Sequence, residues 1–333
     1  MSNYSKIYFL FLAGSLLARE TNSTSAIHGA FDVRIPTYDQ EGRINWELQA
    51  KEVDTVKEGI YLAKEPKIFL LDEQRPATIA RSNSGVFDTE KGVANGSEYL
   101  LVEGEGFEAI GRPWTFEEDR ATSTNRLAFS EHGKIGFEEE VDSDFVKKNG
   151  GVASNPSLDT EGNVSVFNDM EPEFSKDFPT TAYGDKIYLD DLGDGKKRFL
   201  LQKDVLIKMK DLESNTSEEG FTTISCDWAE ILIGKDGNDS TFDSFGMISQ
   251  IHALGNVKLI QPLRKSSADE LKWTEDSAQV ELLGSAKVFH KKWGEAQGEK
   301  IIISEKNGRA EVIGGNEGRS RVLLPALNKI KSE

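Results

Sequence analysis

The chain has 333 residues, and its 40 Lys and Arg against 57 Asp and Glu give a formal net charge of −17. On average such a surface repels phosphate backbones and anionic membranes, which argues against electrostatically driven binding of nucleic acid. The one cysteine, Cys226, can form neither an intramolecular disulfide nor a multi-thiolate metal site. The length is sufficient for two domains of ordinary size.

The N-terminal sequence has the layout of a secretory signal peptide. Lys6 precedes the apolar run at 7–18, which is shorter than the roughly 20 residues that a membrane-spanning helix needs. We expect residues 1–26 to be a signal peptide, with cleavage after Ala18 or Ala26, and a short uncleaved anchor is the alternative. The mature protein would then lie outside the cytoplasm.

Short runs of alternating apolar and polar residues fill most of the chain, and they are clearest between Ile251 and Pro325. In residues 44–50, INWELQA, the apolar side chains fall on one face of a strand, because successive side chains of a strand point to opposite faces. Asn307 and Gly308 separate two such runs and favour a type I′ hairpin turn. Turn signals recur about every 8–12 residues, and no run has a helical period. The sequence therefore predicts an all-β fold of antiparallel hairpins.

The pattern divides the chain into two strand-rich regions, at 28–145 and 181–326. Between them, residues 146–180 lose the alternation and are rich in Pro, Gly, Asn and Ser, which is typical of a linker or a long irregular loop. Residues 327–333 are expected to form a tail. We therefore expect two all-β units in tandem.

The residue types that usually carry catalysis or bind metal ions are sparse and separated. His28, His132, His252 and His290 have no second His or Cys at metal-ligand spacing, so we expect no metal site. The chain lacks the G-x-S-x-G turn of serine hydrolases, and Cys226 has no His nearby in sequence. Paired carboxylates of a carbohydrate-active enzyme stay an open alternative. The expected protein is not an enzyme, has no catalytic residues and needs no cofactor.

The alternating faces predict a long apolar interior, and a sandwich that stays open along one edge would offer a groove for an aliphatic ligand. In the N-terminal half, the residues expected to line this groove are Trp46, Leu48, Phe69, Phe87, Leu101, Phe107, Trp114, Phe116, Leu127 and Phe129. In the C-terminal half, they are Val205, Ile207, Met209, Ile224, Trp228, Ile231, Val257, Leu259, Trp273, Val280, Leu282, Val288, Ile302, Val312 and Leu324. The alternative for each of them is ordinary sandwich core.

Several short motifs of the chain resemble a known family. Ser225-Cys226-Asp227, the run ALGNV at 253–257, LLGSAKV at 282–288 and GEKI at 298–301 are similar to the OstA-like domain of LptA, a periplasmic bridge protein of lipopolysaccharide transport. The N-terminal half, with INWELQAKEV, EPKIFLLD and ATIARSNSGVFDTEKG, is similar to LptC, the partner anchored at the inner membrane. The resemblance covers about residues 30–140 and 198–325.

This resemblance implies two tandem open, twisted β-jellyrolls whose apolar interior holds the acyl chains of lipid A. It further implies a non-enzymatic periplasmic protein that carries lipopolysaccharide from the inner to the outer membrane. The implied partners are other jellyroll proteins that pair through strand edges, an inner-membrane transporter and an outer-membrane translocon. A structural or adhesive β-repeat protein of the envelope, with a filled core, is the alternative from a different class.

Overall fold

The structure, a computed structural model, describes residues 29–38, 41–72, 75–119, 124–138, 172–193, 195–210, 220–234, 248–275, 277–304, 309–314 and 320–323. The predicted signal peptide, the Asn307-Gly308 turn itself and the predicted tail lie outside these residues. Within the described part of the chain, no helix has the length and apolar character needed to cross a membrane.

Strands make up the regular structure of the described residues. The strands of the N-terminal half are β1 (Ala30–Tyr38), β2 (Ile44–Lys57), β3 (Ile60–Lys64), β4 (Lys67–Asp72), β5 (Arg75–Ser82), β6 (Ser84–Asp88), β7 (Val93–Gly96), β8 (Leu100–Gly104), β9 (Phe107–Asp119) and β10 (Thr124–Phe137). Those of the C-terminal half are β11 (Thr180–Gly184), β12 (Lys186–Gly193), β13 (Lys196–Lys210), β14 (Phe221–Ile233), β15 (Ile248–Gln261), β16 (Arg264–Thr274), β17 (Gln279–His290), β18 (Gly294–Ser304), β19 (Ala310–Ile313) and β20 (Arg321–Leu323). The prediction of an all-β protein is therefore confirmed.

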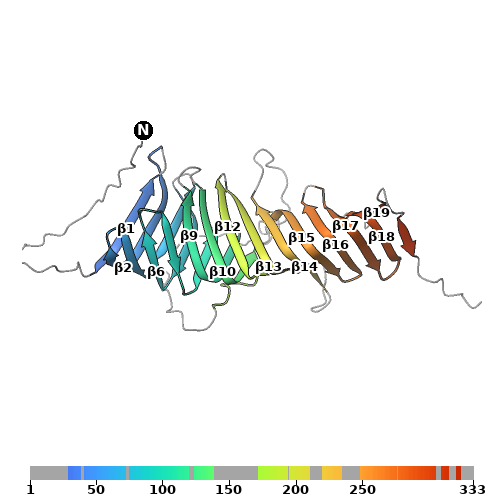
Figure 1. The fold of residues 1–333 in the computed structure, drawn as a ribbon, viewed down its shortest axis with the longest axis horizontal. Helices are drawn as coiled ribbons and strands as arrows, with labels where there is room; N and C mark the ends of the chain where they lie inside the picture. The colour runs from blue at the N-terminus through green and yellow to red at the C-terminus, as the bar shows by residue number, and fades with distance from the viewer. Residues whose placement is uncertain are drawn as a thin grey trace, which may run out of the picture.

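All these strands belong to one 20-stranded antiparallel sheet. Figure 1 shows them stacked obliquely along one long axis, with β1 and β2 near one end and β18 and β19 near the other. The two halves are joined through β10, which pairs with β9 on one side and with β11 and β12 on the other. The sheet thus continues across the predicted boundary at 146–180, and the division into two units stays a prediction.

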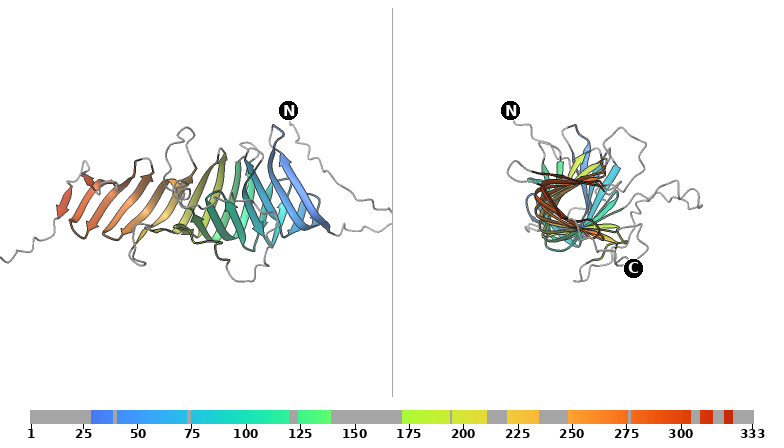
Figure 2. Two further views of the ribbon diagram at one scale, coloured as in Figure 1. Left: turned by 180° about the vertical axis from the view of Figure 1, so that it is seen from behind. Right: turned by 90° about the vertical axis from the view of Figure 1, so that its right-hand side faces the viewer.

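The long strands bend once, so that the sheet forms two walls. β2, for example, pairs with β4 through residues 46–49 and with β3 through residues 52–57. Wall A consists of β4, β5, β8, β11, β20 and the segments of the long strands that pair with them. Wall B consists of β3, β6, β7, β12, β19 and the remaining segments of the long strands. The end-on view in Figure 2 shows how the strands curve around the long axis.

The bends, which we call corners, lie where the register of neighbouring strands shifts. In β13, β15 and β17 the corners are the dipeptides Lys203-Asp204, Gly255-Asn256 and Gly284-Ser285, in which both residues have positive φ angles. Such left-handed residues interrupt the ladder and redirect the strand, in the manner of a β-bulge. Each corner therefore passes one strand from one wall to the other.

An aspartate of the neighbouring strand lies against each glycine-containing corner. Asn256 Nδ2 donates a hydrogen bond of 2.8 Å to Asp227 Oδ2, and a Cβ atom on Gly255 would lie 2.5 Å from the same oxygen. Asp269 Oδ2 has the same relation to Gly284, again at 2.5 Å. The motifs SCD, ALGNV and LLGSAKV thus contain the residues that bend the sheet.

The described end of the predicted linker packs on the outer face of wall A. Phe178 is buried against Gly136, where its ring leaves no room for a Cβ atom. The backbone N–H of Ser175 donates a 2.9 Å hydrogen bond to the buried carboxylate of Glu108. Thr180 then begins β11 at the expected end of the linker. Residues 172–179 are therefore held against the strands.

Candidate functional site

The interior between the two walls is one continuous apolar cluster that extends from Trp46 on β2 to Ile303 on β18. Between β2 and β13, aromatic rings from opposite walls meet edge to face. The ring of Trp46 in wall A lies 5.1 Å from that of Phe116 in wall B, and Phe107 in wall A lies 5.0 Å from Phe199 in wall B. Such edge-to-face pairs stabilise packing beyond the area that they bury. The walls are thus held together by their side chains.

Beyond β13 the character of the interior changes. The buried apolar side chains that the structure describes there are aliphatic or small: Ile224, Cys226, Ala229, Ile231, Ile233, Ile248, Ile251, Ala253, Val257, Leu259, Ala268, Leu271, Val280, Leu282, Ala286, Val288, Ile301 and Ile303. Trp273, which packs against this cluster, is only partly buried. The interior up to β13 is therefore filled by large rings, whereas the interior beyond β13 is lined by smaller side chains.

Most of the residues expected to line the groove do face the interior. Those buried in it are Trp46, Leu48, Phe87, Phe107, Trp114, Phe116, Leu127, Phe129, Val205, Ile207, Ile224, Ile231, Val257, Leu259, Val280, Leu282 and Val288. Met209, Trp273 and Val312 are partly buried and pack against it. Leu324 lies outside the described residues. Whether any of these residues binds a ligand stays a prediction.

Phe69, Leu101, Trp228 and Ile302 do not line the interior, contrary to expectation. The residues on either side of Phe69, Leu101 and Ile302 are the buried ones, because these three lie in runs that are apolar on both faces of the strand. Alternation cannot assign a face in such a run. In β14 the corner is the register shift between Ser225 and Trp228. Trp228 follows this shift and pairs with the exposed Leu254, so its predicted position was wrong because the shift changes the alternation.

The walls meet along the corners, and we call the opposite side, between the free rims of the walls, the mouth. Within the described residues, no backbone hydrogen bond joins the two rims. Polar side chains cross the mouth near the N-terminal end of the sheet. Asn45 of wall A donates a 3.2 Å hydrogen bond to Glu118 and accepts one of 3.3 Å from Asn125, both of wall B. At this end of the sheet, side chains and not strand pairing thus bridge the mouth.

Several buried polar atoms of the interior lack a hydrogen-bond partner among the described residues. They include Nε1 of Trp46 and of Trp114, Oγ1 of Thr78 and Oγ of Ser266. An unpartnered buried donor or acceptor costs about 1–3 kcal/mol, so these atoms would gain from a ligand or water molecule that hydrogen-bonds to them.

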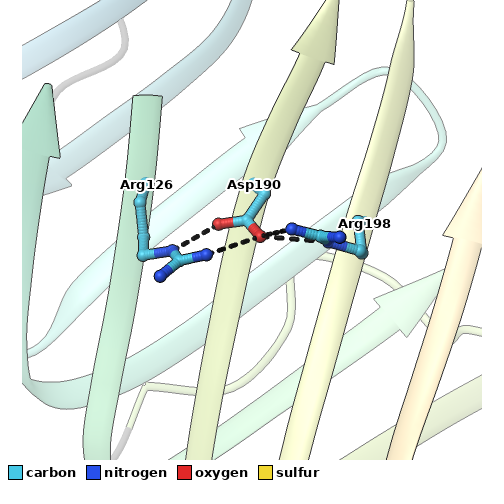
Figure 3. Close-up of polar contacts among 3 residues, drawn as sticks. All are labelled: Arg126, Asp190 and Arg198. Atoms are coloured by element: carbon cyan, nitrogen blue, oxygen red, sulfur yellow. Dashed lines mark hydrogen bonds and ion pairs between the residues drawn. The ribbon is translucent and has the colours of Figure 1, made fainter. Parts of the chain in front are cut away.

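A cluster of charges on the outer face of wall B ties the two halves together. Asp190 of β12 lies between Arg126 of β10 and Arg198 of β13, and Figure 3 shows both guanidinium groups directed at its carboxylate. The Arg126 Nε and Arg198 Nη2 atoms each lie 2.6 Å from an oxygen of Asp190. Burial alone would raise the pKa of Asp190, but the hydrogen bonds from the two arginines outweigh it and lower the pKa below its usual value. The carboxylate therefore stays ionised and stabilises the junction.

The remaining titratable groups are dispersed. Among the residues that the structure describes, no three His, Cys, Asp or Glu side chains are placed to hold a metal ion together. His252 pairs with Glu270 at 2.8 Å on the outer face of wall B, and His290 stacks on Trp293 with a centroid separation of 4.1 Å. Burial is the main cause that raises the pKa of Cys226 to about 12, so its thiol is protonated near neutral pH.

Sequence reasoning did not identify the corner residues or the Arg126–Asp190–Arg198 cluster as structural features. The Gly-Asn and Gly-Ser pairs within strand-like runs were the available signal for the corners. The charge cluster joins strands far apart in sequence and had no local signal. No protein-family model matches the chain, and no curated protein matches it.

Proposed function

We propose that the chain is a non-enzymatic lipid carrier of the periplasm, which binds lipopolysaccharide or a similar amphiphile by its acyl chains and carries it from the inner to the outer membrane. The observation that supports this most is the continuous apolar interior between two walls that are hydrogen-bonded along their corners and not along their rims. Separation of the rims would expose this interior along its length without breaking any strand pairing among the described residues.

Acyl burial alone would supply a large driving force. Each methylene group removed from water contributes about 0.8 kcal/mol, so about ten methylenes contribute about 8 kcal/mol before the walls are parted. The C-terminal half is the favoured location, because its aliphatic and alanine side chains can be displaced more easily than the packed rings of the N-terminal half. The unpartnered hydroxyl of Ser266 lies in this region, opposite Leu259 and Val288 in the sheet, and could bond a polar atom of the amphiphile.

In this proposal the two halves are tandem open, twisted β-jellyrolls. Among the described residues, β1 pairs only with β2, and β19 and β20 pair only with β18, so both ends of the sheet present an edge. Unpaired backbone groups of an edge strand can bind a strand of another protein. The proposed partners are therefore jellyroll proteins of a transport bridge, which would connect an inner-membrane transporter to an outer-membrane translocon.

A structural or adhesive envelope protein with a filled core is the competing function. It is favoured by the near-complete burial of the interior side chains, for example 0% exposure of both Leu282 and Ile301. A filled core and a closed groove differ in whether the interior can be reached by lipid. The test must therefore compare the interior with the outer face of the same wall.

Trp273 and Trp228 provide a matched pair for this comparison. Both are partly buried tryptophans of wall B, but Trp273 packs against the interior, whereas Trp228 contacts His252 on the outer face. Each is replaced by photoreactive benzoylphenylalanine, and the protein is irradiated with lipopolysaccharide. We expect crosslinking from position 273 and little from position 228. The organic extract of the purified protein, examined by mass spectrometry, should in parallel contain acylated glycolipid.

The carrier function is refuted if neither position crosslinks lipid and the extract contains no acylated glycolipid under gentle purification. The filled-core alternative then gains support. Equal crosslinking from both positions would also count against the proposal, because it indicates adsorption of lipid to the surface and not entry into the interior.

A further inference from the structure

The outer face of wall A in the C-terminal half carries two adjacent rows of side chains, which we call the basic face. Strand register places Lys258, Lys287 and Arg321 in one row, with Ser267 and Gln297 between them. The next row contains Ile260, Lys265, Phe289, Glu295 and Leu323. All these side chains come from consecutive hairpins of the sheet and point away from the interior.

The charge of the basic face is opposite to that of the protein as a whole. Its rows contain four basic residues and one acidic residue, Glu295, on a chain with a formal charge of −17. Within the described residues, Lys258, Lys265 and Lys287 have no carboxylate within ion-pair distance. Lys272 and Lys300 of wall B in the same half differ, because they are paired with glutamates at 2.8 and 2.9 Å.

Large apolar side chains lie among these lysines. Ile260 and Phe289 are 46% and 51% exposed. A depression of about 300 Å³ between them is also lined by Lys258, Lys265, Lys287 and the single acidic residue, Glu295. At the rim of wall A, the turns that follow β15 and β17 expose Leu263 (47%) and Trp293 (51%). Exposed aromatic and aliphatic side chains beside lysines are the combination that binds the interface of an anionic bilayer.

We propose that the basic face docks the protein on the surface of an anionic phospholipid bilayer. Phe289, Leu263 and Trp293 enter the boundary between headgroups and acyl chains, while Lys258 and Lys265 contact the lipid phosphates. An acidic protein partner would explain the lysines but not the apolar turn residues at the rim, so we favour the bilayer. Because these turns border the mouth, docking would place the mouth of the C-terminal half next to the membrane. The docking does not depend on whether the interior binds lipid.

The test measures cosedimentation of the purified full chain with vesicles of phosphatidylcholine alone or with phosphatidylglycerol added. The charge variant is Lys258→Gln, Lys265→Gln and Lys287→Gln together. Each lysine near an anionic surface contributes enough for roughly a fivefold change in partitioning, so the variant should bind anionic vesicles about 100-fold more weakly. The apolar variant, Phe289→Ser with Trp293→Ser, should also bind more weakly. Binding of the unchanged protein should fall steeply as salt is added.

Matched controls carry equal changes elsewhere on the surface. Lys51, Lys91 and Lys272 are changed to Gln in the charge control, and the exposed Val56 and Leu192 are changed to Ser in the apolar control. The apolar N-terminal run is the same in every variant, so differences in vesicle binding between variants measure the contribution of the basic face. Both controls should retain binding, and circular dichroism should be unchanged throughout.

The proposal is overturned if the charge variant binds anionic vesicles as well as the unchanged protein does, or if its control loses binding equally. It is also overturned if the unchanged protein binds polyglutamate but shows no preference for anionic vesicles, because an acidic protein would then be the better partner. Crosslinking of lipopolysaccharide from position 273 should be unaffected by the charge variant, so that failure of docking and failure of the carrier function are distinguishable.

Discussion

Replacement of Gly284 by alanine should destabilise the protein more than the same replacement at another glycine with positive φ. Gly284 has a φ of +70°, which costs a residue with a side chain about 1–2 kcal/mol. An added Cβ atom would also lie 2.5 Å from Oδ2 and 3.0 Å from Cβ of Asp269. Rotation of the Asp269 side chain moves the oxygen but not its Cβ atom, so the backbone of the corner must shift. We expect this contact to add about 1–2 kcal/mol.

Gly195 supplies the control for this experiment. Its φ is +72°, and an added Cβ atom would have no heavy atom within 4 Å. Gly195→Ala should therefore show the conformational cost alone, about 1–2 kcal/mol, and Gly284→Ala about 2–4 kcal/mol. Thermal unfolding followed by circular dichroism measures both losses of stability, and the melting temperature should fall by about 2–4 °C for each kcal/mol. An Asp269→Gly background should remove much of the difference.

Equal losses of stability in Gly284→Ala and Gly195→Ala would refute the argument that Asp269 restricts the corner. They would show that the corner accommodates a methyl group without strain and that the contact with Asp269 does not restrict the bend. A loss at Gly284 that persists unchanged in the Asp269→Gly background would refute it as well, since the penalty would then have another source.

Two further predictions concern titratable groups. Asp190→Asn should destabilise the protein by about 2 kcal/mol at neutral pH, because two arginines lose their shared counter-charge. Folding lowers the pKa of Asp190, so its contribution to stability is present above the unfolded pKa of about 3.9 and is lost as the pH falls through the folded pKa. The difference in unfolding free energy between the variant and the unchanged protein should therefore shrink below about pH 4. A pH-independent difference would contradict this. Cys226, whose pKa is raised to about 12, should resist alkylation by iodoacetamide near neutral pH and react quickly in denaturant. Fast alkylation of the folded protein would show that the walls separate at the corner of β14.

The strand pattern could be predicted from the sequence because most strands bury only one of their two faces. Trp46 and Leu48 alternate with polar residues and are both buried as expected. The hairpin at Asn307-Gly308 was similarly local, and β18 and β19 do pair around it, with Ser304 N–H bonded to the carbonyl of Arg309 at 2.9 Å. Features that depend only on residues close together in the sequence could therefore be predicted.

Features that depend on the bends were not accessible. At its register shift, β14 changes its alternation by one residue, so that Cys226 and Ala229 are both buried and Trp228 points outward. The run Ile301 to Ile303 is apolar on both faces, and only the register with β17 shows that Ile302 points outward. The pairing of β10 with β11 and β12 spans the region expected to separate two units. The basic face could not be predicted either, because its lysines come from successive strands of an acidic chain and only strand pairing brings them together.

The bend of the sheet and the edges at its two ends together determine how this chain could pair with another strand. A closed barrel removes its edges, but a sheet that only bends keeps them at both ends. Here one end is β1, whose Phe31 is 70% exposed, and the other is formed by the short strands β19 and β20. Short terminal strands limit uncontrolled pairing, whereas β1 crosses both walls and offers an edge to each of them. A strand pair added along β1 would therefore extend both walls together, and with them the apolar interior. The same bend that makes the interior thus determines that an edge-to-edge assembly along β1 would lengthen it.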